Sequence, residues 1–94
     1  MSVFWTPEAL ADRHSIYDYK EADSPDAAVS LDERFSDEAK RLSTYPYLGR
    51  PGRISGTREL VVHQNYILIY NVAGTVIRVL RVLHVARQWP IVRQ

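Results

Sequence analysis

The sequence predicts an α+β domain with the element order β-α-α-β-β-β, in which a helical hairpin packs on an antiparallel sheet. Two observations support this prediction. The first half of the chain contains two helix-start signals, each a hydroxyl residue followed by proline and an acid. The second half contains three runs of branched and aromatic residues separated by short turns. With 94 residues, the chain is expected to form a single domain over residues 1–94.

The N-terminal stretch predicts a short strand that leads directly into a helix. "SVFW" is of β type, and "TPE" supplies a capping hydroxyl, a proline at the first helical position and an acid in the first turn. We expect the helix to cover residues 7–21. Its candidates for the inward face are Leu10, Ile16 and Tyr17.

A second helix follows at once, because "SPD" at residues 24–26 repeats the same start signal. Its apolar residues recur at spacings of three and four, which places them on one stripe. These residues are Ala28, Leu31, Phe35, Ala39 and Leu42. The stripe either packs into the domain's own core or is left partly exposed as a groove for a partner.

Three strands are predicted from "TRELVV", "YILIYNV" and "TVIRVLRVLHV", joined by the turns "HQN" and "AGT". Together they form an antiparallel meander. Strict alternation in the last strand places Arg78, Leu80, Val82 and His84 on one face and Ile77, Val79, Arg81, Leu83 and Val85 on the other. Residues 90–94 are expected to form a flexible tail.

Charge is divided unevenly along the chain. Residues 1–47 carry five cations and ten anions, a net charge of −5, whereas residues 48–94 carry seven arginines and the single acid Glu59, a net charge of +6. Arginine without lysine favours bidentate recognition of carboxylate or phosphate groups. Alternatively, these arginines pair with the acidic helices of the same chain.

Several classes of protein are disfavoured. The chain has no cysteine, which excludes disulfides and thiolate metal sites, and its three histidines lack the paired spacing of metal ligands. No metal and no cofactor are therefore expected. The N-terminus does not read as a signal peptide, and the apolar runs are too short to cross a membrane. We expect a cytoplasmic protein.

The connector "YPYLGRPGRISGTREL", residues 45–60, invites comparison with a phosphate-binding loop because it contains three glycines and three arginines. It has neither the Gly-Lys-Ser/Thr ending of a P-loop nor G-x-G-x-x-G spacing. Phosphate loops also follow a strand and begin a helix, whereas this segment follows a helix and begins a strand. Its glycines instead indicate turns that use unusual backbone angles.

The end of the last strand gathers the residues with the most chemical potential: Arg81, His84, Arg87 and Trp89. A histidine beside arginines can act as a general acid or base while the arginines stabilise a phosphate. Alternatively, the histidine and tryptophan close the end of the sheet. No serine elbow and no carboxylate pair occur in the second half, which disfavours hydrolysis by those routes.

The predicted element order, with the stretches "YPYLGRPGRISGTREL", "NYILIYNV" and "VIRVLRVLHVARQWP", resembles the RelE/ParE superfamily of bacterial toxins over nearly the whole chain. The resemblance implies the RelE/ParE-like fold. It also implies one of two activities. RelE-type members cleave messenger RNA on the ribosome with basic side chains, whereas ParE-type members are associated with poisoning of DNA gyrase.

This sequence departs from the RelE pattern at two positions, where Ile67 and Leu60 replace basic residues and only Arg58 remains in the earlier strand. The resemblance is therefore closer to the ParE branch. It implies a toxin that inhibits gyrase by binding rather than as a catalyst. The alternatives are a ribosome-dependent endoribonuclease that uses His84 and Arg87, and a toxin-fold protein with a different or lost target.

The resemblance also implies binding surfaces and partners. Target-binding candidates are Arg58, Arg81, His84, Arg87 and Trp89. The expected neutralising partner is a cognate antitoxin with an acidic, flexible segment, which would form a hetero-oligomer with the toxin. Its contacts would be Tyr17, Leu31 and Phe35, provided that part of the helical stripe is exposed.

Overall fold

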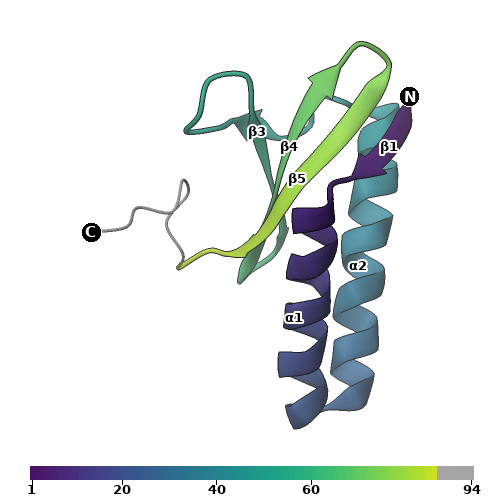
Figure 1. Cartoon of the computed structure of the whole chain (residues 1–94), viewed down its shortest axis with the longest axis vertical. Coiled ribbons are helices and arrows are strands. Elements are labelled where there is room, and N and C mark those ends of the chain that lie inside the picture. The colour runs from purple at the N-terminus through teal and green to yellow at the C-terminus, as the bar shows by residue number, and fades with distance from the viewer. Residues whose placement is uncertain (87–94) are drawn as a thin grey trace.

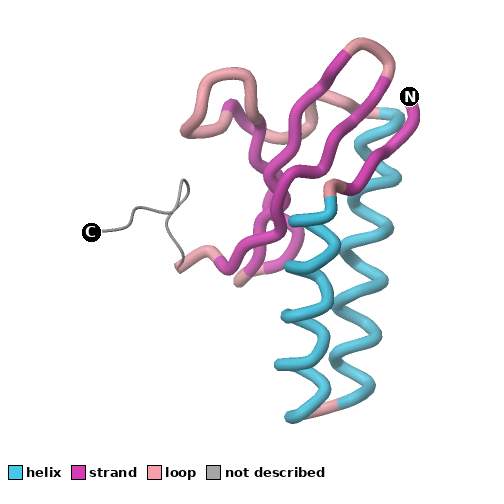
Figure 2. Tube along the Cα trace, viewed as in Figure 1, coloured by secondary structure: helices cyan, strands magenta, loops and turns pink. Residues whose placement is uncertain are grey.

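The computed structural model describes residues 1–86 and confirms the predicted β-α-α-β-β-β order, with one additional short strand in the connector (Figures 1 and 2). The elements are β1 (Ser2–Trp5), α1 (Pro7–Asp23), α2 (Pro25–Thr44), β2 (Arg50–Pro51), β3 (Arg58–His63), β4 (Tyr66–Ala73) and β5 (Val76–His84). The predicted tail, residues 90–94, lies outside the described residues, as do Arg87 and Trp89.

The strands form one sheet in the order β1-β5-β4-β3-β2. Strands β2 to β5 are antiparallel, as predicted, but β1 pairs with β5 in parallel, with Ser2 opposite Val76. The sheet is therefore mixed. A parallel pair needs a long crossover between its strands, and here the intervening chain supplies one because it includes the helical hairpin and the meander.

The two helices lie side by side against one face of the sheet and continue past its lower end in Figure 1. Both predicted caps are present: the Thr6 hydroxyl oxygen accepts a hydrogen bond from the Ala9 amide at 3.1 Å, and that of Ser24 accepts one from the Ala27 amide at 3.3 Å. Helix α1 ends at Asp23 rather than at residue 21, because the Ser24 amide still bonds to the Lys20 carbonyl oxygen. Ser24 thus ends one helix and begins the next.

The core lies between the helices and the sheet. All five residues of the predicted α2 stripe are buried in it. On α1, however, Ala9 is buried and Leu10 is 48% exposed, so the expectation that Leu10 faces inward is wrong. The rotation of α1 is fixed at its first turn, because the Thr6 hydroxyl also donates a hydrogen bond to the Leu80 carbonyl oxygen at 2.9 Å.

Strand β5 contains a bulge that changes its predicted faces. Tyr70 of β4 lies opposite Val79, but the preceding residue, Ile69, lies opposite Arg81, so Leu80 is an extra residue. Val82 consequently packs in the helix-side core with Val79, and the prediction that it lies on the opposite face is wrong. From this bulge onward, the alternation predicted for Val82, Leu83 and His84 is reversed.

The connector is held by contacts within the chain. The Tyr70 hydroxyl donates to the Pro46 carbonyl oxygen at 2.8 Å and accepts from the Gly49 amide at 2.9 Å. The Gly52 amide bonds to Thr57, and the Arg53 amide bonds to the Glu59 carboxylate. These amides are already used, which agrees with the prediction that the connector is not a phosphate cradle.

Replacing Gly49 with alanine is expected to destabilise the protein by about 2–4 kcal/mol. A Cβ atom there would lie 2.8 Å from the Glu59 carbonyl oxygen and 2.8 Å from the Tyr70 ring, and relieving the clash would break the bond to the Tyr70 hydroxyl. Urea denaturation measures the effect. As a control, Ser55→Ala in the same connector is exposed and should change stability by less than about 0.5 kcal/mol. Equal stability of the two variants would refute this account.

Candidate interaction site

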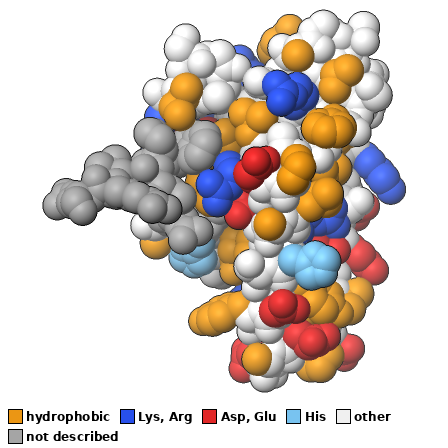
Figure 3. Space-filling view, viewed as in Figure 1, with side chains coloured by type: hydrophobic (Ala, Val, Ile, Leu, Met, Phe, Trp, Pro, Cys, Tyr) orange, Lys and Arg blue, Asp and Glu red, His pale blue; other side chains and the backbone are white. Residues whose placement is uncertain are grey.

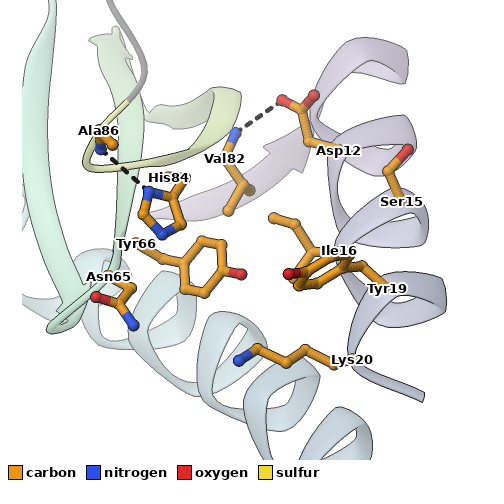
Figure 4. Close-up of a pocket in the computed structure, with 10 residues that line it drawn as sticks. All are labelled: Asp12, Ser15, Ile16, Tyr19, Lys20, Asn65, Tyr66, Val82, His84 and Ala86. Atoms are coloured by element: carbon orange, nitrogen blue, oxygen red, sulfur yellow. Dashed lines mark hydrogen bonds between the residues drawn. The ribbon is translucent and has the colours of Figure 1, made fainter. Parts of the chain in front are cut away.

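A hollow of about 750 Å³ opens between α1, the start of β4 and the end of β5 (Figure 4). Ile16, Val82 and the Tyr66 ring give it an apolar floor. The polar groups around this floor include Lys20 and His84. The hollow therefore combines apolar surface with a few hydrogen-bonding groups, as binding sites commonly do.

Tyr66 lies between two histidines in this region. Its ring centroid is 5.3 Å from that of His84 in an edge-on arrangement and 6.2 Å from that of His63. The tyrosine is only 4% exposed, and its hydroxyl points into the hollow (Figure 4). Burial, and to a smaller degree the neighbouring Tyr19, raises the pKa of Tyr66 above its ordinary value. The hydroxyl thus stays protonated at neutral pH and can donate a hydrogen bond.

His84 lies where the sequence placed it, near the end of the last strand. Its Nδ1 accepts a hydrogen bond from the Ala86 amide at 3.1 Å. A neutral imidazole that accepts at Nδ1 carries its proton on Nε2, which leaves Nε2 as the donor toward a ligand. His84 is exposed, so its edge-on contact with Tyr66 does not seal the end of the sheet.

Arg81, predicted to bind the target, is engaged within the chain. Its Nε and Nη2 atoms bond to the two Asp12 carboxylate oxygens at 2.7 and 3.0 Å. The same carboxylate accepts the Val82 amide at 2.9 Å. The hydrogen bond to Asp12 raises the pKa of Arg81 despite partial burial. At this position the alternative interpretation of the basic strands, pairing with the chain's own acidic helix, is correct.

Arg58 is also engaged, at the opposite end of the sheet. Its Nε donates to the Gly49 carbonyl oxygen at 2.9 Å, and its guanidinium lies 5.3 Å from the centroid of the Tyr47 ring. Arg58 lies opposite Tyr70, whereas His84 lies opposite Tyr66. Four residues of strand separate these positions, a distance of roughly 13 Å. Among the described residues, the predicted target-binding side chains therefore do not converge.

The predicted antitoxin contacts divide into buried and accessible residues. Both Phe35 and Leu31 pack in the core: Phe35 has no exposed surface, and Leu31 is 8% exposed. The exposure on which their predicted contact with an antitoxin depends is therefore absent at Phe35 and small at Leu31. Tyr17 is partly exposed on α1, beside a second hollow with Leu10 and His14. Partial burial and the Glu21 carboxylate raise the pKa of Tyr17. Tyr17 is the most exposed of the three, and Leu31 reaches the surface only at a hollow that it lines with Arg34 and His63.

The two positions that depart from the RelE pattern are both buried. Ile67 packs with Ile69 and Leu83 in a small apolar cluster separate from the main core. Leu60 belongs to the main core itself. A cation at either site would have to be buried in apolar surroundings, which is energetically costly unless the charge is paired. These parts of the sheet thus hold apolar side chains where an RNA-cleaving relative would carry charge.

Sequence reasoning did not single out Lys20 or Tyr19. Both lie on α1, where the spacing from Asp12 through Ile16 to Tyr19 and Lys20 places them along one side of the helix. That spacing was the available signal. The spacing was not recognised as a site, because the acidic residues around Lys20 make this part of the helix resemble an ordinary solvated surface.

Within residues 1–86, no three His, Cys, Asp or Glu side chains are grouped closely enough to hold a metal ion. No helix in that range combines the length and apolarity that crossing a membrane would require.

Comparison with known proteins identifies the family. Residues 3–89 match the family described as "ParE toxin of type II toxin-antitoxin system, parDE". The chain is 43% identical to Y4kP of Sinorhizobium fredii, covering 94% of this chain and 92% of Y4kP, and 40% identical to toxin RelE2 of Caulobacter vibrioides, covering 90% and 96%.

Among solved structures, the chromosomal ParDE toxin–antitoxin system from P. aeruginosa contains a chain with a TM-score of 0.81 and 29% identity. The alignment covers 90% of this chain and 96% of that one. The similarity extends across the helical hairpin and the sheet, and it agrees with the match over residues 3–89. This chain therefore belongs to the ParE toxin family of type II toxin–antitoxin systems, within the RelE/ParE superfamily.

Proposed function

We propose that this toxin inhibits DNA gyrase by binding to it, without cleaving nucleic acid itself. The observation that carries the proposal is the burial of Ile67 and Leu60, which fill two positions where RelE-type nucleases carry cations. Transition-state charge in RNA cleavage must be balanced by cations held near the reacting phosphate. The similarity to the P. aeruginosa ParDE chain favours the same branch of the superfamily.

The proposal includes a neutralising antitoxin that forms a hetero-oligomer with the toxin in the cytoplasm. An acidic, flexible segment of that antitoxin would order itself on the toxin surface. The similarity to a chain from a ParDE toxin–antitoxin system supports this assignment. Tyr17 remains a candidate contact, and Arg87 and Trp89 remain candidates for the target surface outside the described residues.

The purified toxin should abolish supercoiling by purified gyrase. Induction of the toxin in cells without its antitoxin should leave messenger RNA intact. The physical reason is that an inhibitor acts through binding and needs no assembled acid–base site. A supercoiling assay with the purified toxin and primer extension on cellular messenger RNA measure the two effects. Codon-phased RNA cuts together with unaffected supercoiling would contradict the proposal.

A second candidate, a ribosome-dependent endoribonuclease, is favoured by two observations: the exposed His84 imidazole lies beside Tyr66, and the chain is 40% identical to toxin RelE2. This function would use His84 as acid or base together with Arg87, three positions later in the sequence. His84→Gln should then abolish RNA cutting while leaving the fold intact. If His84→Gln is as toxic as the wild type and neither protein cuts RNA, the nuclease candidate fails.

A further inference from the structure

The connector between α2 and β3 exposes basic and aromatic side chains at the β2 edge of the sheet, and part of it projects away from the helices (Figures 1 and 2). We define this connector patch by five residues: Tyr45, Tyr47, Arg50, Arg53 and Arg58. Tyr45 is 59% exposed and Tyr47 is 67% exposed. Open aromatic rings beside arginines are typical of a surface that contacts a partner.

The connector patch is positively charged because its cations have no exposed acid among them. Residues 39–58 contain five cations and no acid: Lys40, Arg41, Arg50, Arg53 and Arg58. The next acid, Glu59, is only 2% exposed and is bonded to Arg50 Nη2 at 3.3 Å and to the Arg53 amide at 3.1 Å. Most acids on the face drawn in Figure 3 lie over the helices instead. The patch therefore favours an anionic partner.

Tyr47 is held as a flat platform by Arg58. The Arg58 guanidinium lies 5.3 Å from the ring centroid, and its Nη2 donates to the Tyr47 carbonyl oxygen at 3.3 Å. Arg58 is thus a positioning residue, since its own donors are used within the chain. A hollow of about 250 Å³ lies beside the ring and is also lined by Pro51 and Thr57. The exposed part of the ring can stack on a planar group.

The arginines offer donors that the connector amides do not. Those amides are used within the chain, whereas the Arg53 side chain makes no hydrogen bond or ion pair with another residue in the range 1–86. The Arg50 side chain remains 63% exposed although it bonds to Glu59. Arginine pairs with phosphate through two parallel hydrogen bonds. A nucleotide with an unpaired base supplies both a phosphate and a stacking face, whereas a carboxylate on an acidic peptide supplies no flat face for Tyr47.

We propose that the connector patch binds a DNA strand with unpaired bases, so that one base stacks on Tyr47 and the neighbouring phosphates pair with Arg50 and Arg53. The inference rests on the proposed function for the choice of DNA, because gyrase acts on DNA and would present it to a bound inhibitor. It adds a contact with the DNA to the contact with the enzyme. The patch lies at the end of the sheet opposite to His84, so this contact is separate from the strand-end residues.

The test is fluorescence anisotropy of the full chain with a labelled single-stranded DNA of about eight nucleotides at low salt. Arg53→Glu should weaken binding by about tenfold or more, because a phosphate contact is replaced by repulsion. Tyr47→Leu should weaken it by about fivefold to a hundredfold, whereas Tyr47→Phe keeps the ring and should bind like the wild type. Both positions are exposed, so all three variants should keep the wild-type Tm.

The matched control is Arg78→Glu, which makes the same change in net charge. Arg78 is exposed on β5, three strands away from β2 in the sheet, a distance of roughly 14 Å. Its effect should stay within about twofold, because charges that far from the bound strand are largely screened. Equal losses for Arg53→Glu and Arg78→Glu would overturn the connector patch, since only net charge would then matter.

Four further results separate the possible ligands and the two proposals. Tyr47→Leu binding as tightly as Tyr47→Phe would refute base stacking. Displacement of the DNA by polyglutamate at equal charge concentration would show that the patch takes acidic peptides, and much tighter binding of RNA of the same sequence would refute the assignment to DNA. Gyrase inhibition by a wild-type chain that binds no DNA would overturn the patch alone. DNA binding that follows the variants, with unaffected supercoiling, would support the patch and refute gyrase as the target.

Discussion

Replacing Asp12 with alanine is expected to lower the free energy of unfolding by about 2–4 kcal/mol. The Asp12 carboxylate accepts three hydrogen bonds, two from the Arg81 guanidinium and one from the Val82 amide. Its side chain is 13% exposed and that of Arg81 is 22% exposed. Solvent therefore reaches the pair only in part, and the expected loss lies somewhat below the value for a fully buried pair.

The position of Asp12 explains why the loss should be large. Strand β1 pairs with β5 only as far as Val79, so the backbone of β5 beyond that point lacks a neighbouring strand on this side. The Asp12 carboxylate occupies that place and accepts the Val82 amide. Asp12→Asn keeps an acceptor but loses the charge, and it should cost less than Asp12→Ala.

Urea denaturation of Asp12→Ala, Asp12→Asn and the control Asp18→Asn tests this account. Asp18 is exposed on the same helix and should change stability by less than about 0.5 kcal/mol. A double-mutant cycle of Asp12→Asn with Arg81→Met should give a coupling energy of about 1–3 kcal/mol. A coupling near zero would mean that the ion pair contributes nothing, whatever the single variants do.

The same contact affects how toxicity data should be interpreted. Arg81 is a natural choice for mutagenesis because it is an arginine near the end of the last strand. Its removal leaves Asp12 without its cation in a largely buried position, so loss of toxicity would follow from instability alone. Target-binding roles are better tested at His84, which is exposed and makes no ion pair with the described residues.

The helices were predictable because their signals are local. A capping hydroxyl, a proline and an acid set each start, and a spacing of three and four sets the buried face of α2. All of these signals lie within a few residues of the feature they specify. The hydroxyl caps of Thr6 and Ser24 and the burial of the whole α2 stripe accordingly match the prediction.

The features that escaped prediction depend on distant pairing. The bulge at Leu80 reverses the faces of the residues after it, yet Leu80 itself is an ordinary apolar strand residue. The fixing of α1 by Thr6 joins residues 74 positions apart, and the Asp12 and Arg81 pair spans 69. Strict alternation and net charge cannot anticipate such contacts, because they carry no information on which elements become neighbours.

The candidate site shows the same division. His84 lies at the strand end, as the sequence predicted, but its exposure was left open there, because a histidine that closes the end of the sheet was the alternative. Lys20 was overlooked, since the hollow that it lines is formed with Tyr66, from a strand more than forty residues later. Arg58 was grouped with His84 on the resemblance to the toxin superfamily, and the strand register places the two at opposite ends of the sheet.

Phe35→Ala is expected to destabilise the protein by about 3–5 kcal/mol. The side chain is fully buried and packs edge-on against Tyr66 at a centroid distance of 5.7 Å. Truncation removes both the buried ring and its aromatic contact, and it leaves a cavity between α2 and the sheet. Small domains are stabilised by only about 5–15 kcal/mol, so the variant should be close to unfolding at growth temperature.

Thermal and urea denaturation measure the loss, with Val29→Ala as the control on the same helix. Val29 is 43% exposed, and its truncation should cost less than about 0.5 kcal/mol. Adding the antitoxin separates a core role from a contact role. A partner that binds only the folded toxin raises the apparent stability of any variant that keeps the binding surface. Phe35→Ala should therefore regain stability in the complex, whereas a variant with normal stability and no binding would show that Phe35 contacts the antitoxin directly.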